Sequence, residues 1–259
     1  MPSPGDAHMN ALEALYLVHS GLPRMGPGSN ECTTRAYRSV RLESSNPLIV
    51  DTGCGSGASS LVLSRLSGGT VISVDSYRPF LLDLRARAWA LLGPRQGGIQ
   101  PIQASMGSLP LRKECADLVW SEGAIYLMGF EQGLVSWRPL LKEGGSLVVS
   151  EVTWLKSEVP EQIRSYWAAN YPGIATDASH RDTIARSGFV LRDSFPLPPS
   201  AWWNYYRPLQ GRMRKFRREY ADDAIVQKVL DEIDEEIGMF ERFQAFYGYV
   251  MYIMEKPDA

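Results

Sequence analysis

Short apolar runs alternate with helical segments between residues 47 and 195, and this alternation restricts the folds open to the chain. Segments with apolar residues at helical spacing separate most of the runs. Strands joined through helices by short connections favour βαβ units and a parallel, doubly wound sheet, so we predict an α/β fold. The expected strands are PLIVD at 47–51, TVISVD at 70–75, IQPIQAS at 99–105, ADLVWSE at 116–122, SLVVSEV at 146–152 and FVLRDSF at 189–195.

The helical pattern extends beyond this core on both sides. A long helical stretch runs from 197 to about 245, and YGYVMYIME at 247–255 closes the chain. A strand that follows such an excursion adds at the sheet edge, so we expect a seventh, antiparallel strand. We predict one domain, with an N-terminal helical lid (1–42), a core (43–196), a helical cover (197–245) and the last strand (246–259). The other expected helices cover 9–20, 30–42 (capped by Ser29 or Asn30), 58–67, 78–93, 134–142, 160–170 and 178–187.

Composition narrows the classes of function. The 259 residues carry a formal net charge of -2, which argues against a nucleic-acid or membrane-surface partner. The stretch RMRKFRR is followed by acidic residues and is typical of a salt-bridged helix face. Three cysteines without a CxxC pair and three histidines without ligand spacing predict neither disulfides nor a metal site. With no signal peptide and no apolar run of about 20 residues, we expect a cytoplasmic protein. We expect it to be a monomer or a homodimer.

A glycine-rich loop, IVDTGCGSG at 49–57, follows the first expected strand. Glycines in the first βα turn permit a tight turn and let a ligand approach the backbone closely. Asp75 ends the next strand, where it is placed to accept hydrogen bonds from ribose hydroxyls. The loop also satisfies the G-x-G-x-x-G/A dinucleotide pattern. These residues alone therefore fit either NAD or S-adenosylmethionine.

Further motifs separate the two cofactors. Asp51 stands inside the turn, Ser121-Glu122-Gly123 ends the fourth strand, and LLKEGGSLVVSE spans the fifth. With these motifs the chain resembles class I S-adenosylmethionine-dependent methyltransferases over about 40–195 and the last strand. The stretches LPRMGPGS, WSEGAIYLMGFEQGLVSWRPLLKEGG and AWWNYYRPL are similar to a group of small bacterial and archaeal methyltransferases with largely unassigned substrates. The resemblance implies a Rossmann-like, seven-stranded sheet with S-adenosylmethionine as methyl donor.

The resemblance also assigns roles to residues. The glycine loop would wrap the amino acid end of the cofactor, Asp75 would hold the ribose, and Arg24 with the MGPGS loop would close over the carboxylate. Many relatives carry an Asp where this chain has only Ser105. The full set implied for the cofactor is Arg24, Gly28, Asp51, Gly53, Gly55, Gly57, Asp75, Ser76, Tyr77, Ser105, Met106, Ser121, Glu122 and Gly123.

Two acids and a group of aromatic residues are the candidates for acceptor chemistry. Glu122 would act as a base, orient the substrate or hold the cofactor; Glu151 and Tyr126 are further catalytic candidates. Aromatic faces hold apolar or cationic substrates, although core packing explains many of them equally well. His19 could be catalytic, but a lone histidine is more often structural. The predicted substrate-binding residues are Tyr126, Trp154, Trp167, Trp202, Trp203, Tyr205 and Tyr206.

We therefore predict methyl transfer to a small molecule at an unassigned N, O, S or C atom, because covers at both ends of the rim suit an enclosed substrate. One alternative keeps the cofactor but cyclises its amino acid part and releases methylthioadenosine. Another is a non-catalytic binding or regulatory protein on the same fold. An NAD-dependent oxidoreductase is disfavoured because the chain shows no Tyr-x-x-x-Lys or comparable proton donor.

Overall fold

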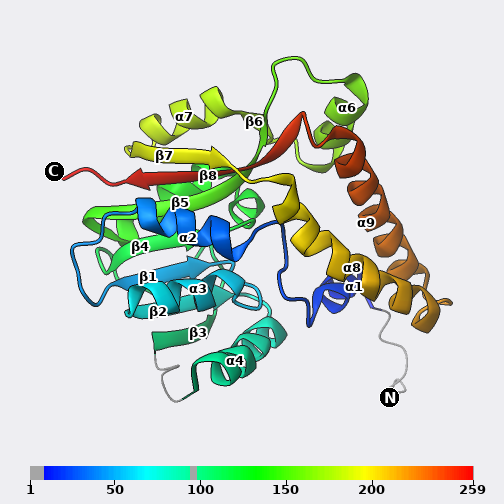
Figure 1. The fold of residues 1–259 in the computed structure, drawn as a ribbon, viewed down its shortest axis with the longest axis horizontal. Helices are drawn as coiled ribbons and strands as arrows, with labels where there is room; N and C mark the ends of the chain where they lie inside the picture. The colour runs from blue at the N-terminus through cyan, green and yellow to red at the C-terminus, as the bar shows by residue number, and fades with distance from the viewer. Residues whose placement is uncertain (1–8, 94–97, 259) are drawn as a thin grey trace, which may run out of the picture.

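The computed structural model describes residues 9–93 and 98–258, which are built around one mixed β-sheet (Figure 1). The main strands lie in the order β3-β2-β1-β4-β5-β8-β7, and β8 runs antiparallel to β5 and β7. This confirms the predicted seven-stranded, mostly parallel sheet with an antiparallel last strand. The expected edge position of that strand is wrong, because β8 pairs with both β5 and β7 and leaves β7 at the edge. The two-residue β6 is an addition that pairs with the end of β5. The strands are β1 (Leu48–Thr52), β2 (Thr70–Asp75), β3 (Ile99–Gln103), β4 (Ala116–Ser121), β5 (Leu141–Trp154), β6 (Ala175–Thr176), β7 (Val190–Pro196) and β8 (Tyr247–Glu255).

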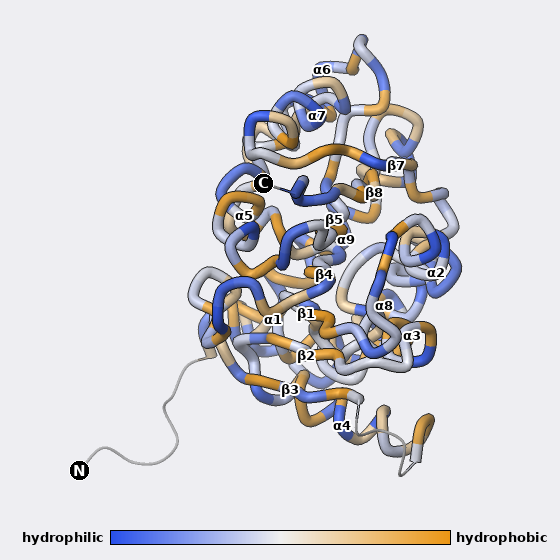
Figure 2. The backbone as a smooth tube through the Cα atoms, turned by 90° about the vertical axis from the view of Figure 1, so that its left-hand side faces the viewer, coloured by the Kyte–Doolittle hydropathy of each residue, from blue (hydrophilic) through white to orange (hydrophobic). Residues whose placement is uncertain are grey.

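Helices cover both faces of this sheet. Those on one face include α2 and α3, while α5 and α7 pack on the other through a second apolar cluster. The core strands read as continuous apolar runs because both their faces are covered; hydrophobic residues mark β1 and β2 in Figure 2. The helices are α1 (Ala11–His19), α2 (Asn30–Ser39), α3 (Ala58–Ser67), α4 (Arg78–Leu92), α5 (Phe130–Trp137), α6 (Glu161–Asn170), α7 (Asp177–Arg186), α8 (Pro199–Glu219) and α9 (Ala224–Phe243).

Helices α1, α8 and α9 form a layer beside the sheet (Figure 1). The segment predicted as one long helical stretch is divided at 220–223, where Asp223 caps α9 by accepting hydrogen bonds from two backbone N–H groups. Asn10 begins α1 with a reciprocal capping box, and Ser29 caps α2 as expected. Within 9–93 and 98–258, no helix combines the length and hydrophobicity needed to span a membrane. The first eight residues of the predicted lid, with one of the three histidines, lie outside the described residues.

The segment predicted as a helix over 134–142 is placed differently. Helix α5 ends at Trp137, a 3-10 turn (η3, Arg138–Leu140) follows, and β5 already begins at Leu141. The KEGG residues lie within this strand, because Leu141 pairs with Ala116 and the two glycines bond to Lys256. Gly144, in a left-handed conformation with φ of 66°, donates its N–H to the Lys256 carbonyl at 3.1 Å, and the Gly145 carbonyl accepts from the Lys256 N–H at 2.8 Å. The double glycine is an irregularity inside the strand and does not terminate a helix.

Candidate active site

The glycine loop connects β1 to α3 at the carboxyl edge of the sheet. Gly53, Gly55 and Gly57 have φ angles of 70°, 53° and 78°, a left-handed conformation that side chains rarely adopt. A Cβ on Gly57 would lie 2.1 Å from Leu84 Cδ1, so glycine also permits α4 to pack here. No side chain caps the start of α3, and the backbone of the loop faces the rim.

Asp51, inside this turn, is completely enclosed by protein. One carboxylate oxygen, Oδ2, accepts hydrogen bonds from Ser59 Oγ at 2.8 Å and Ser60 Oγ at 2.6 Å. The other, Oδ1, is buried without a partner among the described residues. Burial raises the pKa of Asp51 to about 7, and the nearby Glu122 and Asp75 add to the shift against the two serine hydrogen bonds.

Asp75 ends β2 and braces the glycine loop. Its carboxylate accepts hydrogen bonds from the backbone N–H of Gly55 at 2.9 Å and of Tyr77 at 2.8 Å. Burial raises its pKa although these bonds oppose the shift. The Tyr77 ring stacks on Tyr16 of α1 with centroids 4.3 Å apart, which brings the lid to this end of the site. Tyr16 was not among the predicted site residues.

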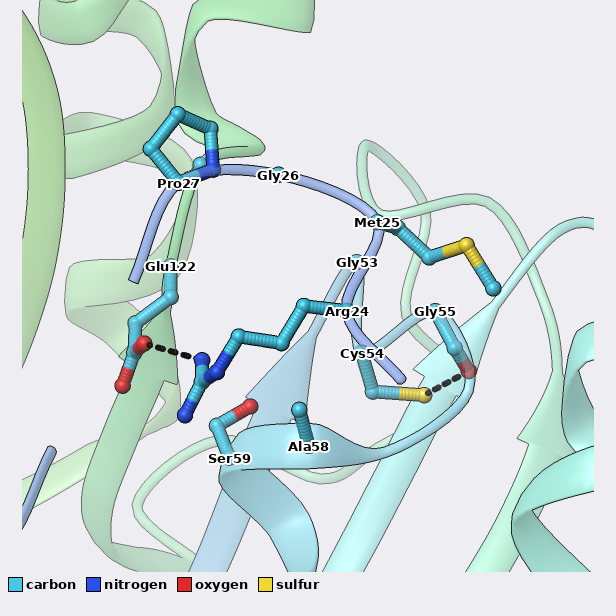
Figure 3. A pocket seen from close by; sticks show the side chains of 11 residues that line it. Arg24, Met25, Gly26, Pro27, Gly53, Cys54, Gly55, Ala58, Ser59 and Glu122 are labelled. Carbon is cyan, nitrogen blue, oxygen red and sulfur yellow. Dashed lines mark hydrogen bonds and ion pairs between the residues drawn. The ribbon is translucent and has the colours of Figure 1, made fainter. Parts of the chain in front are cut away.

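Glu122, just past β4, lies in a network of three donors. Its Oε1 accepts from Thr33 Oγ1 at 2.7 Å and from Trp120 Nε1 at 2.9 Å, and its Oε2 is 3.3 Å from Arg24 Nη1. The Arg24 and Glu122 side chains are only 11% and 7% exposed. Figure 3 shows the guanidinium reaching across the glycine loop to the carboxylate. Glu122 is thus paired on both oxygens.

The loop before α2 closes over these groups. Gly28 donates its N–H to the carbonyl of Ala201 at 3.0 Å, and its own carbonyl accepts from Asn204 at 3.3 Å, so α8 fixes the loop. Met25 lies against Gly55, where an added Cβ would be 2.8 Å from Met25 Cγ. The resulting pocket is lined by Arg24, Met25, Gly26, Pro27, Gly53, Cys54, Gly55, Ala58, Ser59, Glu122 and Gly123 (Figure 3).

The pocket therefore brings together five of the predicted cofactor residues: Arg24, Gly53, Gly55, Glu122 and Gly123. The rest lie around it. Ser121 is buried and donates to the Thr52 carbonyl, whereas Ser76 and Ser105 are exposed at the next two strand ends. The Met106 methyl group lies close to Gly53, and its carbonyl accepts from Trp137 Nε1.

Glu151 occupies the same rim one strand further along. The pairing of β4 with β5 ends at Ser121 and Val149, and Gly123 then donates its N–H to Ser150 Oγ at 2.8 Å, next to Glu151 in the sequence. The Glu151 side chain is 0% exposed, and neither carboxylate oxygen has a hydrogen-bond partner among the described residues. Burial raises its pKa to about 8; the Tyr171 hydroxyl is near enough to oppose the shift without a well-formed hydrogen bond. Tyr126, 37% exposed, packs edge-on against Tyr171 with centroids 5.8 Å apart.

The predicted aromatic residues of the cover are mostly packed together. Trp202 is 2% exposed and stacks on Phe240 of α9 with centroids 4.4 Å apart, while buried Tyr206 donates to Glu236 at 2.8 Å. Three tryptophans are partly buried: Trp154 and Trp167 pack on Tyr247, and Trp203 packs on Phe240. These contacts place the residues in the layer between α8, α9 and β8.

His19 and Tyr205 join the lid to this layer. His19 Nδ1 lies 2.7 Å from the Leu15 carbonyl and Nε2 lies 2.7 Å from the Tyr205 hydroxyl, so both ring nitrogens are paired. Burial lowers the pKa of His19. Among the residues that the structure describes, no group of three or more His, Cys, Asp or Glu side chains is arranged to hold a metal ion.

Comparison with known proteins places this geometry in context. A family model described as a methyltransferase domain matches residues 50–149. The chain carries the class I methyltransferase fold. The fold matches a SAM-dependent methyltransferase from Geobacter sulfurreducens in complex with S-adenosyl-L-homocysteine (TM-score 0.81, 18% identity, 95% of this chain and 98% of that one). It also matches a Thiobacillus denitrificans counterpart (0.78, 18%, 92% and 96%) and YjhP from E. coli (0.81, 18%, 95% and 99%). No curated protein sequence matches the chain.

The site of this methyltransferase fold carries charged and hydrogen-bonding groups that fit S-adenosylmethionine. That molecule carries an α-ammonium, an α-carboxylate, a sulfonium and a ribose. The rim offers an unpaired Asp51 oxygen deep in the turn, a guanidinium in the lid, and the half-buried Asp75 carboxylate one strand away. These groups match the charges of the ammonium and the carboxylate and can accept hydrogen bonds from the ribose hydroxyls.

Proposed function

We propose that the chain is a methyltransferase that binds S-adenosylmethionine and methylates a small molecule. The arrangement of Arg24, Glu122 and the glycine loop around one pocket carries this proposal. When bound, the cofactor supplies an electrophilic methyl group on its sulfonium. The cover over the rim favours a small acceptor, because α1, α8 and the loop before α2 are joined to one another.

Each residue role follows from its contacts. Arg24 would exchange part of its pairing with Glu122 for the cofactor carboxylate, with bidentate geometry available to the guanidinium. Glu122, held by Thr33 and Trp120, would then orient the cofactor amino group. Asp75 would hold the ribose hydroxyls, and Tyr77 would flank the adenine. Methyl transfer is an in-line displacement, so such positioning is the main contribution of the protein.

Calorimetry and product analysis test this function. S-adenosylmethionine and S-adenosylhomocysteine are expected to bind, and NAD is not. Asp75→Ala is expected to weaken binding by about 1–3 kcal/mol, the cost of leaving a buried hydrogen-bonding group without its partner. Asp75→Asn, which keeps an oxygen to accept from Gly55 or Tyr77, separates loss of the ribose contact from collapse of the loop. Unchanged affinity in Asp75→Ala would remove the ribose assignment.

Other chemistry on this fold has a structural precedent. The [4+2]-cyclase SpnF matches the chain with a TM-score of 0.72 at 16% identity, covering 96% of this chain and 93% of that one. Product identity distinguishes the routes. S-adenosylhomocysteine marks methyl transfer, and methylthioadenosine marks cyclisation of the amino acid part. Tight cofactor binding without turnover over a broad panel of acceptors would favour a non-catalytic role.

A further inference from the structure

Among the residues that the structure describes, Asp51, Glu122, Glu151 and Glu236 are buried or largely buried acids near the rim, and of these Glu151 alone has no well-formed hydrogen bond. Asp51 accepts from two serines, Glu122 from three donors, and Glu236 from Tyr206. Glu151 has 0% exposure and two unpartnered oxygens. An unsatisfied buried carboxyl costs several kcal/mol or stays neutral, so its retention next to a pocket calls for a partner that the chain itself does not supply.

The surroundings of Glu151 favour a positively charged partner. The groups that interact with it electrostatically are the phenols of Tyr126, Tyr171 and Tyr249, and no basic side chain of the described residues perturbs it. Tyrosine rings attract a cation through their faces. An acceptor bearing a carboxylate or phosphate would instead meet an acid with no compensating charge.

The position of Glu151 fits the reacting end of an acceptor. Its neighbour Ser150 accepts a hydrogen bond at Oγ from the N–H of Gly123 at 2.8 Å, and Gly123 lines the pocket beside the glycine loop. Glu122 thus lies just past the end of β4, and Glu151 lies near the end of the neighbouring strand β5, opposite Val250 of β8. Glu122 is held by protein donors, while Glu151 faces the two partly exposed rings, Tyr126 and Tyr171.

We propose that the acceptor is an amine whose nitrogen binds the Glu151 carboxylate beside the rings of Tyr126 and Tyr171. This inference rests on the proposed methyl transfer. An ammonium group can satisfy both carboxylate oxygens at once, whereas a hydroxyl or thiol has one proton to donate. The ionic partner also restores the charged form of the buried acid.

The chemical step balances with groups already named. The bound ammonium gives one proton to the Glu151 carboxylate, which frees the nitrogen lone pair. That pair forms the N–C bond with the methyl carbon as the C–S bond breaks. The two electrons of the C–S bond stay on sulfur, which leaves S-adenosylhomocysteine as a neutral thioether. The proton on Glu151 then passes to water.

Three matched probes test the inference by calorimetry in the presence of S-adenosylhomocysteine: benzylamine, benzyl alcohol and benzoate. The wild-type protein is expected to bind benzylamine at least about tenfold more tightly than benzyl alcohol, and benzoate most weakly. Glu151→Gln is expected to lose this preference. The control Glu236→Gln, in which the other unassigned acid is altered, is expected to keep it.

The affinity for S-adenosylhomocysteine, measured in each protein, distinguishes failure of the amine assignment from failure of the proposed methyl transfer. Equal affinity in the wild type and Glu151→Gln shows that the variant is folded. If S-adenosylhomocysteine binds but benzylamine and benzyl alcohol bind equally, or if Glu151→Gln retains the amine preference, the amine assignment is wrong and methyl transfer stands. If the wild type does not bind S-adenosylhomocysteine, both proposals fall.

Discussion

At the scale of the residue, Arg24 offers the sharpest test of how the cofactor is oriented. Its guanidinium is nearly buried and lies 3.3 Å from Glu122. If it holds the cofactor carboxylate, Arg24→Met is expected to weaken S-adenosylhomocysteine binding by about 1.5–3 kcal/mol, the value of a hydrogen bond to a charged group. Methylthioadenosine lacks the amino acid end, so its affinity is expected to change little. Calorimetry with both ligands measures the difference.

An equal loss for the two ligands would contradict this assignment and would mean that Arg24 acts only by holding the lid. Arg24→Lys is the matched control, because it keeps the charge without the planar fork. It is expected to recover part of the S-adenosylhomocysteine affinity.

Local backbone features around the candidate site were predictable from the sequence, whereas the roles assigned to its residues stay predictions. The glycine loop, Asp75 and the Ser29 cap each depend on a few neighbouring residues. The pairing of Arg24 with Glu122 joins positions 98 apart, and Thr33 and Trp120 complete it from other elements. No spacing in the sequence indicates these contacts, nor that Tyr171 faces Glu151.

At the scale of the element, the lid helix α1 is tied to α8 by the buried His19–Tyr205 hydrogen bond and by a second one, which Arg212 of α8 donates to the Leu17 carbonyl at 3.1 Å. Tyr205→Phe removes only the hydroxyl that pairs with His19 Nε2. Because a net hydrogen bond contributes about 1 kcal/mol, amides of α1 are expected to exchange with deuterium about fivefold faster. Mass spectrometry of peptides from α1 and β1 measures this, and β1 is expected to stay unchanged.

Tyr206→Phe is the comparison for that experiment. It removes the neighbouring hydroxyl, which donates to Glu236 between α8 and α9, and leaves the His19 contact intact. Exchange in α1 is therefore expected to match the wild type in this variant. Equal acceleration in both variants, or in neither, would show that the His19–Tyr205 bond does not hold the lid.

The periodicity of apolar residues predicted which segments are helices and which are strands, but some of their boundaries depend on pairing across the sheet. The KEGG segment has the composition of a helix end followed by a turn, yet it lies inside β5. Leu141 and Ser146 on either side of it pair with β4, and its two glycines bond to Lys256 just past β8. In the cover segment, by contrast, the sequence pattern predicted the contacts correctly. Its charged residues gave a salt-bridged helix face as predicted, with Arg217 of α8 contacting Asp231 and Asp234 of α9.

At the scale of the whole molecule, buried acids make stability depend on pH. The pKa of Glu151 is about 8 in the folded protein against 4.5 for an ordinary glutamic acid. Between these values the folded state holds a proton that the unfolded state has released. The free energy of unfolding therefore falls as pH rises through this window, by at most about 1.4 kcal/mol per pH unit for this group. Asp51, with a pKa raised to about 7, acts in the same direction.

Comparison of the wild type with Glu151→Gln isolates one group. His180, whose pKa burial lowers to about 4, has the opposite effect below its ordinary value of 6.5, but it and Asp51 are common to both proteins. Denaturant unfolding at pH 5, 6, 7 and 8, without ligand, is expected to show the variant gaining stability relative to the wild type as pH rises. A difference that stays constant with pH would show that Glu151 is not an acid kept neutral by burial. A positive result would mean that the fold gives up stability at neutral pH to keep an unpaired acid at the rim.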